Sequence, residues 1–190
     1  MAKRALIVVD VQPTFCEDGE LGVIGGNAVA ERIAEFAEDR RADYDLVVTT
    51  QDWHIEPGDH FSDTPDFVDT WPPHGVADTP NAQLHPALGD LEVDAAIKKG
   101  QYQAAYSGFE GEDEEGRTLV EVLQDAEIEA LDIVGIAESH CVKQTALDGI
   151  TEGFEVRVFS DLTVPVSEDQ GVAARELMAQ AGVVLANSAD

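Results

Sequence analysis

Basic residues are scarce in this chain, whose 190 residues include 11 lysines and arginines against 39 aspartates and glutamates, for a formal net charge of −28 at pH 7. Nucleic acid is therefore not an expected partner, because binding a phosphate backbone requires clustered cations. A disordered chain could share this imbalance, but the 44% apolar content and regular hydrophobic periodicity favour a folded protein. We expect a halophilic surface, rich in carboxylates and working in concentrated salt that screens their repulsion.

Cysteines and long hydrophobic runs are also few. The two cysteines, Cys16 and Cys141, do not make a disulfide framework. No segment approaches the length of a transmembrane helix. The apolar run that follows Lys3 and Arg4 stops at Asp10, short of the core of a signal peptide. We therefore expect a cytoplasmic protein that has no membrane partner.

Strand patterns alternate with helix patterns along the whole chain. Helices are expected after Asn27, Thr118, Cys141 and Ser167, where a capping residue or a turn precedes helical spacing. Strands are expected at 4–9, 45–50, 93–98, 133–136, 154–159 and 183–186. This alternation predicts a three-layer α/β/α fold, with a mainly parallel sheet of about six strands, as a single domain over residues 1–190.

Four chemically reactive side chains follow the ends of different predicted strands: Asp10, Asp52, Lys99 and Cys141. In open α/β sheets, ligands bind at the carboxyl ends of the strands. We therefore expect these four groups to share one site.

Cys141 lies where a strand pattern passes into a helix pattern. A helix N-terminus stabilises a thiolate, which suits a nucleophile, although a small buried cysteine would also fit this position. A nucleophilic thiol needs a base and a neighbouring cation, and Asp10 with a lysine would supply both. Lys98 and Lys99 compete for that role in a chain that has only four lysines.

The segment 51–87 is long and irregular, and it holds His54, His60 and His74 a short distance after Asp52. Imidazole and carboxylate are suitable ligands for zinc, iron or manganese. The histidines could instead be exposed polar residues. A bound metal ion would order a loop that has little regular structure of its own, which favours a metal site.

Taken together, these motifs resemble the nicotinamidase/pyrazinamidase family of isochorismatase-like cysteine hydrolases. The resemblance rests on five segments that occur in family order: Ile7–Phe15, Asp52-Trp-His54 with His60-Phe61, Trp71-Pro-Pro-His74, Lys99-Gly100 with Ala105–Phe109, and Gly135–Val142. It implies a Rossmann-like, isochorismatase-like fold. Two positions depart from the common family pattern, Gly75 in place of a cysteine and Ser139 in place of an aspartate.

The resemblance also implies roles for individual residues. Cys141 would be the nucleophile, Asp10 the general base, and Lys99 the adjacent cation, because the family lysine immediately precedes the glycine. One divalent metal ion would be held by Asp52, His54, His60 and His74. The substrate would contact Phe15, Trp71, Tyr106, Ala137 and Cys141. The Ile136–Ala137 peptide would be cis, and the N–H groups of Ala137 and Cys141 would form an oxyanion hole. His140 is expected to be structural, and Cys16 and His85 receive no role.

The implied activity is hydrolysis of nicotinamide to nicotinate and ammonia through a Cys141 thioester, in NAD salvage, with pyrazinamide also accepted. The nearest alternative is a sister cysteine amidohydrolase that acts on another small amide, such as an N-carbamoyl compound. A non-catalytic binding module on the same fold is a further alternative. A homo-oligomer is compatible with the sequence, which does not give the oligomeric state.

Overall fold

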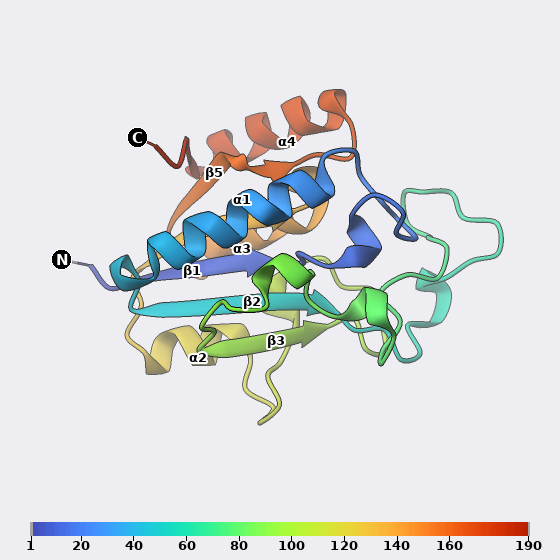
Figure 1. Ribbon diagram of the computed structural model, residues 1–190, viewed down its shortest axis with the longest axis horizontal. Helices are drawn as coiled ribbons and strands as arrows, with labels where there is room; N and C mark the ends of the chain where they lie inside the picture. Colours follow the sequence, from blue (N-terminus) through green and yellow to red (C-terminus); the bar gives the residue numbers. More distant parts are fainter. Residues whose placement is uncertain (1, 190) are drawn as a thin grey trace.

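A six-stranded sheet organises the computed structural model, which describes residues 2–189 (Figure 1). Its strands are β1 (Arg4–Val9), β2 (Leu46–Asp52), β3 (Ala95–Lys99), β4 (Ala130–Ile136), β5 (Glu155–Val164) and β6 (Val184–Ala186). They lie in the order β3-β2-β1-β4-β5-β6, and each neighbouring pair is parallel. The predicted α/β fold with a parallel sheet is confirmed.

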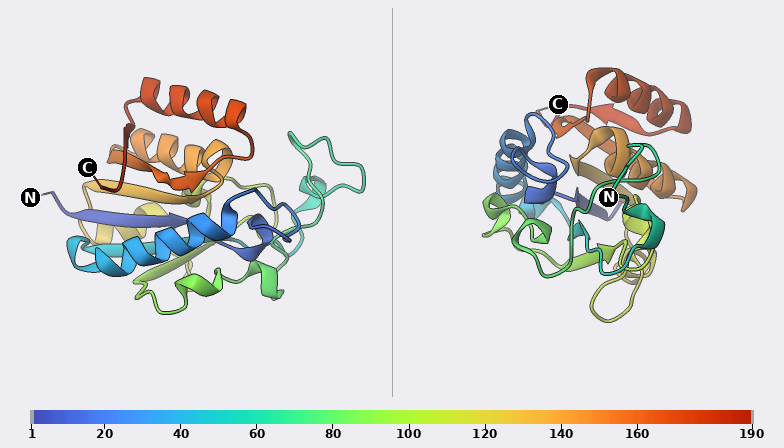
Figure 2. Two further views of the ribbon diagram at one scale, coloured as in Figure 1. Left: turned by 45° about the horizontal axis from the view of Figure 1, so that its top comes forward. Right: turned by 90° about the vertical axis from the view of Figure 1, so that its right-hand side faces the viewer.

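Four helices cover the sheet: α1 (Gly26–Asp39), α2 (Leu119–Asp125), α3 (Lys143–Thr151) and α4 (Glu168–Ala181). Leu6 and Val8 of β1 share one buried cluster with Ile33 of α1, whereas Ile7 shares another with Val142, next to α3. Successive strand residues point to opposite faces, so β1 is buried on both sides. Helix α1 therefore covers one face and α2, α3 and α4 cover the other (Figure 2).

Side-chain caps begin two of the helices, whereas α1 begins without one. Thr118 caps α2, as predicted, and Ser167, where a helix was expected to start, caps α4. The prediction that Asn27 caps α1 is wrong, because the helix begins at Gly26 after Gly25, whose φ is +89°. The Glu17 carboxylate accepts hydrogen bonds from the N–H groups of Gly25 (2.6 Å) and Asn27 (2.8 Å). Glu17, in the preceding loop, therefore satisfies the free N–H groups at the start of α1, a role that an N-cap side chain usually has.

Strands β2 and β3 extend slightly further than their apolar patterns predict. Asp52 and Lys99 are their last residues rather than the residues after them, and the two are register partners. Residues 53–82 then fold over the carboxyl ends of the strands, on the right in Figure 1, through short turns and the bridges His54–Val76 and Phe61–Trp71. The chain returns beside α1 to the start of β3. This edge of the sheet is where the candidate residues lie.

Among residues 2–189, no helix has the length and apolar character needed to cross a bilayer.

Candidate active site

The carboxyl ends of four strands bring the predicted reactive side chains together. Asp10 follows β1, Asp52 ends β2, Lys99 ends β3, and Cys141 lies in a π-helical turn, Glu138–Val142, between β4 and α3. All four are buried, with side-chain exposure of 0% for Asp10 and Lys99. The sheet therefore places two carboxylates, one ammonium and one thiol in a water-poor environment.

Lys99 is the centre of this cluster. Its Nζ lies 2.9 Å from Asp10 Oδ2, donates a hydrogen bond to Asp52 Oδ1, and lies 3.8 Å from Cys141 Sγ. Burial alone would lower the pKa of Lys99, but the carboxylates of Asp10 and Asp52 raise that pKa well above its usual value. The Lys99 side chain is therefore a permanent ammonium that contacts both Asp10 and Cys141.

Lys98 lies outside the cluster, although it is adjacent in sequence. Its Nζ is 4.1 Å from the centroid of the Trp53 ring and 4.0 Å from Glu114 Oε1. Successive side chains of a strand point to opposite faces, so only one lysine of the pair can reach Cys141. The structure places Lys99 there.

The protonation of Cys141 differs from the expectation based on its helix position. Burial raises the pKa of the thiol well above its ordinary value, and the nearby Lys99 ammonium only partly opposes this. The turn Glu138–Val142 runs directly into α3 at Lys143, so Cys141 lies in the first turn of one continuous helical segment, as predicted. Burial therefore opposes the effect of the helix start, and the raised pKa favours the protonated thiol.

Asp10 is placed to act on that thiol. Thr50 Oγ1 donates a 2.6 Å hydrogen bond to Asp10 Oδ1, while Oδ2 faces Lys99. Burial raises the pKa of Asp10, although Lys99 opposes the rise. A carboxylate in this setting is a stronger base than a carboxylate in water, and it lies beside both the cation and the sulfur.

Three histidines form a second cluster next to the first. The ligand atoms of His54, His60 and His74 all lie within 4.8 Å of one another, and all three side chains are buried. Asp52 Oδ2 lies 3.4 Å from His54 Nε2 and 3.5 Å from His74 Nε2. Asp52 thus joins the two clusters, with one oxygen on Lys99 and the other among the histidines.

The backbone fixes the direction of two of these rings. His54 Nδ1 lies 2.6 Å from the carbonyl oxygen of Gly100, and His74 Nδ1 lies 2.8 Å from that of Pro72. Each Nδ1 therefore carries the proton that it donates to a carbonyl, which leaves Nε2 free to accept. Both Nε2 atoms face the Asp52 carboxylate.

The histidine and aspartate set fits a divalent metal ion. His54 Nε2 and His60 Nδ1 are buried and have no hydrogen-bond partner among the described residues. Burial lowers the pKa of His60 to about 4, so the imidazole is neutral, as a metal ligand must be. Buried polar atoms without partners are rare in proteins, and a bound cation would satisfy both of them.

A cavity of about 530 Å³ opens onto both clusters. Phe15, Trp71 and Tyr106 line it, as expected for a ring-binding pocket, and Trp71 Nε1 donates a 2.9 Å hydrogen bond to Tyr106 Oη. Ala137 and Cys141 line it too. The Ile136–Ala137 peptide is cis, as the family resemblance implied.

Two features of the cavity were not anticipated from the sequence. His140, expected to be only structural, lines the cavity, and its ring centroid lies 5.7 Å from that of Trp71. Ser139 Oγ lies 2.9 Å from His140 Nδ1 and accepts a 3.1 Å hydrogen bond from the Val166 N–H, so this hydroxyl holds the ring in place. The loop from Glu17 to Ile24 forms much of the cavity mouth. The position of His140 next to Cys141 was the available signal for the first feature, whereas no sequence motif marks the second.

Comparisons with known proteins agree with this geometry. The family model of the isochorismatase domain matches residues 4–190. A nicotinamidase/pyrazinamidase of Mycobacterium tuberculosis is 51% identical over 182 residues, which are 96% of this chain and 97% of that protein. The crystal structure of a pyrazinamidase of Pyrococcus horikoshii in complex with zinc matches with a TM-score of 0.83 at 30% identity, over 97% of this chain and 99% of that chain. PnC1 from L. infantum, in complex with nicotinate, matches with a TM-score of 0.85 at 33% identity, over 99% and 94% of the two chains.

Proposed function

The chain belongs to the isochorismatase family, and we propose that it hydrolyses nicotinamide to nicotinate and ammonia through a thioester on Cys141. The observation that carries this proposal is the Lys99 ammonium, which lies 2.9 Å from Asp10 and 3.8 Å from Cys141 at the end of a cavity that also reaches the buried His60 and His74. The 51% identical nicotinamidase/pyrazinamidase supports the same substrate class, with pyrazinamide as a second substrate and NAD salvage as the setting.

In the first half of the reaction, Asp10 removes the proton of Cys141, and the sulfur attacks the carboxamide carbon. Lys99 stabilises the negative charge as it moves from the Asp10 carboxylate to the sulfur. The backbone N–H groups of Ala137 and Cys141 donate to the oxyanion of the tetrahedral intermediate. The protonated Asp10 then gives its proton to the departing nitrogen, the carbon–nitrogen bond breaks, and ammonia leaves a nicotinoyl thioester.

In the second half, Asp10 takes a proton from water, and the resulting hydroxide attacks the thioester carbon. The carbon–sulfur bond breaks, and nicotinic acid leaves and gives its proton to solvent, which yields nicotinate. The proton held by Asp10 returns to the sulfur, which restores the thiol and the carboxylate. Each residue thus ends in its starting state, and one water molecule is consumed for each amide bond.

Asp52, His54, His60 and His74 would hold one divalent metal ion, for which zinc, iron and manganese are candidates. The zinc in the P. horikoshii pyrazinamidase structure supports zinc. When bound, the ion would supply a Lewis acid that orients and polarises the pyridine ring through its nitrogen. Phe15, Trp71 and Tyr106 would hold the faces and edges of the ring, which aligns the carboxamide with Cys141.

The cellular setting follows from the charge and the composition. We propose that the enzyme works in the cytoplasm at high salt, as one domain over residues 1–190, without nucleic-acid partners. These proposals rest on the formal net charge of −28 and on the small number of cysteines.

The decisive experiment measures ammonia release from nicotinamide in about 1 M KCl, where charges are screened beyond about 3 Å. Wild-type protein and Cys141→Ala are compared, with bound metal quantified on the same samples. We expect turnover in the wild type, none in the variant, and equal metal content. Full activity of Cys141→Ala would refute the thioester mechanism.

The assay also separates the substrate from the site. If folded, metal-loaded wild-type protein released no ammonia from nicotinamide, the substrate assignment would fall. A panel of small amides that includes N-carbamoyl compounds would then test the sister amidohydrolase.

A further inference from the structure

Carboxylates gather at the mouth of the cavity. Three exposed carboxylates line it, those of Glu17, Asp18 and Glu20, which we call the acidic mouth. Among the described residues, no lysine or arginine lines the cavity. The loop that carries these residues lies at the carboxyl edge of the sheet, between β1 and α1 (Figure 1).

Hydrogen bonds hold two of these carboxylates in place. Glu17 accepts from the N–H groups of Gly25 and Asn27 at the start of α1. Asn81 Nδ2 lies 3.0 Å from both carboxylate oxygens of Glu20. The charges of Glu17 and Glu20 are therefore fixed in position, unlike that of a freely moving surface side chain.

The cavity differs in charge from one end to the other. At its inner end the buried Lys99 ammonium is paired with Asp10 and Asp52, whereas the charged side chains among the described residues of its outer end are all carboxylates. In the proposed reaction the substrate is a neutral amide, whereas the product is a carboxylate anion. A fixed negative potential at the mouth leaves the affinity for the neutral amide nearly unchanged and lowers the affinity for the anion.

We propose that Asp18 and Glu20 are specificity-determining residues that make the enzyme bind the neutral amide in preference to its carboxylate product. They reduce product inhibition by slowing the entry of the anion, without touching the reacting atoms. This inference rests on the proposed function, because it requires a neutral substrate and an anionic product.

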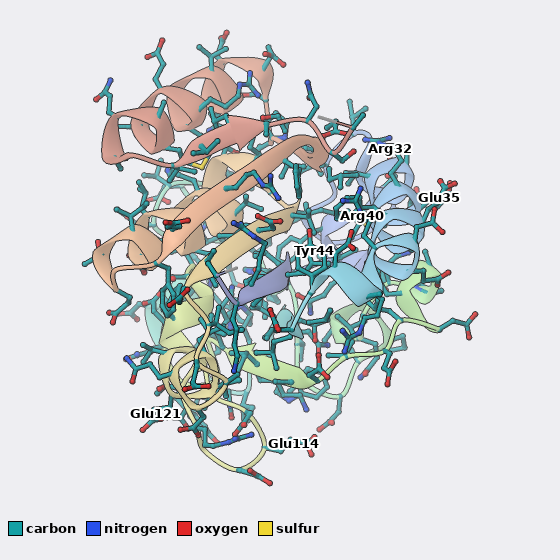
Figure 3. All side chains as sticks on the ribbon, turned by 90° about the vertical axis from the view of Figure 1, so that its left-hand side faces the viewer. Arg32, Glu35, Arg40, Tyr44, Glu114 and Glu121 are labelled. Atoms are coloured by element: carbon teal, nitrogen blue, oxygen red, sulfur yellow. The ribbon has the colours of Figure 1, made fainter. Side chains whose placement is uncertain are left out.

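The test uses the double variant Asp18→Asn, Glu20→Gln. Asn suits position 18, whose φ is +71°, because it tolerates a positive φ, and Gln at position 20 keeps an oxygen for Asn81. Glu17 is left intact because it caps α1. The matched control is Glu35→Gln, Glu38→Gln, which removes the same charge from two exposed positions of α1. Figure 3 shows Glu35 on the outer side of this helix.

All variants are made in the Cys141→Ala background and loaded with zinc, so that both ligands bind without reacting. Calorimetry gives the Kd of nicotinamide and of nicotinate, first at the lowest KCl concentration at which circular dichroism shows native protein. The ratio of the nicotinate Kd to the nicotinamide Kd should fall about threefold in the mouth variant and stay unchanged in the control. In about 1 M KCl the difference should disappear, because the Debye length falls to about 3 Å.

Three results would overturn the inference. An unchanged ratio in the mouth variant would show that these carboxylates do not select against the product. An equal fall in the control would show that only the overall charge of the protein matters. Binding of neither ligand to the Cys141→Ala parent would overturn the proposed function, and this inference with it, whereas the first two results leave the proposed function standing.

Discussion

Replacing Lys99 by methionine tests the centre of the site. Methionine keeps most of the side-chain volume and removes the charge, so Asp10 and Asp52 stay buried without their cation. Removing one partner of a buried ion pair costs about 3–5 kcal/mol. We expect the free energy of unfolding of Lys99→Met to fall by that amount at pH 7, as measured by denaturant titration in about 1 M KCl.

The loss should depend on pH in a defined direction. Without the ammonium, burial raises the pKa of Asp10 further, so the folded state binds a proton at a pH where the unfolded state does not. Stability then falls as pH rises, because the unfolded state binds fewer protons. The stability difference between wild type and Lys99→Met should therefore shrink as the pH is lowered from about 7 to about 5.

Lys99→Met should lower kcat much more than it changes KM. Lys99 contacts the two groups between which negative charge moves, so its loss should lower kcat at least about a hundredfold, while KM changes only a few-fold. Single-turnover ammonia release isolates the acylation step. Bound metal is measured on the same samples, because Lys99 also contacts Asp52.

The neighbouring lysine provides the matched control. Lys98→Met removes a cation that lies over the Trp53 ring and near the exposed Glu114. Contacts of these two kinds are each worth about 1 kcal/mol or less, so stability should change little and kcat should be retained. A folded, metal-loaded Lys99→Met enzyme with kcat within about tenfold of wild type would refute the proposed role of Lys99.

Three further predictions concern the rest of the molecule. Thermal unfolding followed by circular dichroism should show a Tm that rises with KCl, because a net charge of −28 is screened, and a Tm independent of salt would contradict a halophilic surface. Arg175→Gln removes the 2.6 Å partner of the buried Glu138 carboxylate, so stability should fall by about 3 kcal/mol at pH 7 and by less at lower pH, and a pH-independent loss would contradict this. Burial raises the pKa of Cys16 to about 11, so the unfolded state loses that proton first and stability should fall between about pH 9 and 11. Cys16→Ala should reduce this slope, and the buried Cys141 accounts for a further part of it.

The bounds of a strand are predicted best where a charged residue stands at each end of an apolar run. Strand β1 matches its predicted bounds because Arg4 precedes the apolar run and Asp10 ends it. The end of β2 was missed because Gln51 and Asp52 look like loop residues. They continue the strand because β3 pairs with both of them. The hydrophobic pattern of residues 46–52 does not predict this pairing with a distant segment.

For the site, strand ends predict which residues meet but not how they interact. Asp10, Asp52, Lys99 and Cys141 come together because parallel strands end at one edge of the sheet. The preference for Lys99 over Lys98 followed from a family motif, and the structure adds the physical reason, which is strand alternation. Burial is the largest influence on the pKa of Cys141. Several loops that are distant in sequence bury this side chain together, so no single stretch of sequence predicts its pKa.

The raised pKa of the Cys141 thiol agrees with its proposed role once Asp10 is considered with it. Proton transfer between the two depends on the difference between their pKa values, and the same burial raises both. The transfer moves one negative charge from the Asp10 oxygen to sulfur and leaves the net charge of the site unchanged. Lys99 Nζ lies 2.9 Å from Asp10 Oδ2 and 3.8 Å from Cys141 Sγ, so it stabilises the negative charge both on Asp10 and on the sulfur. A dry site with a shared cation therefore keeps the thiol protonated at rest and still allows Asp10 to activate it when the amide arrives.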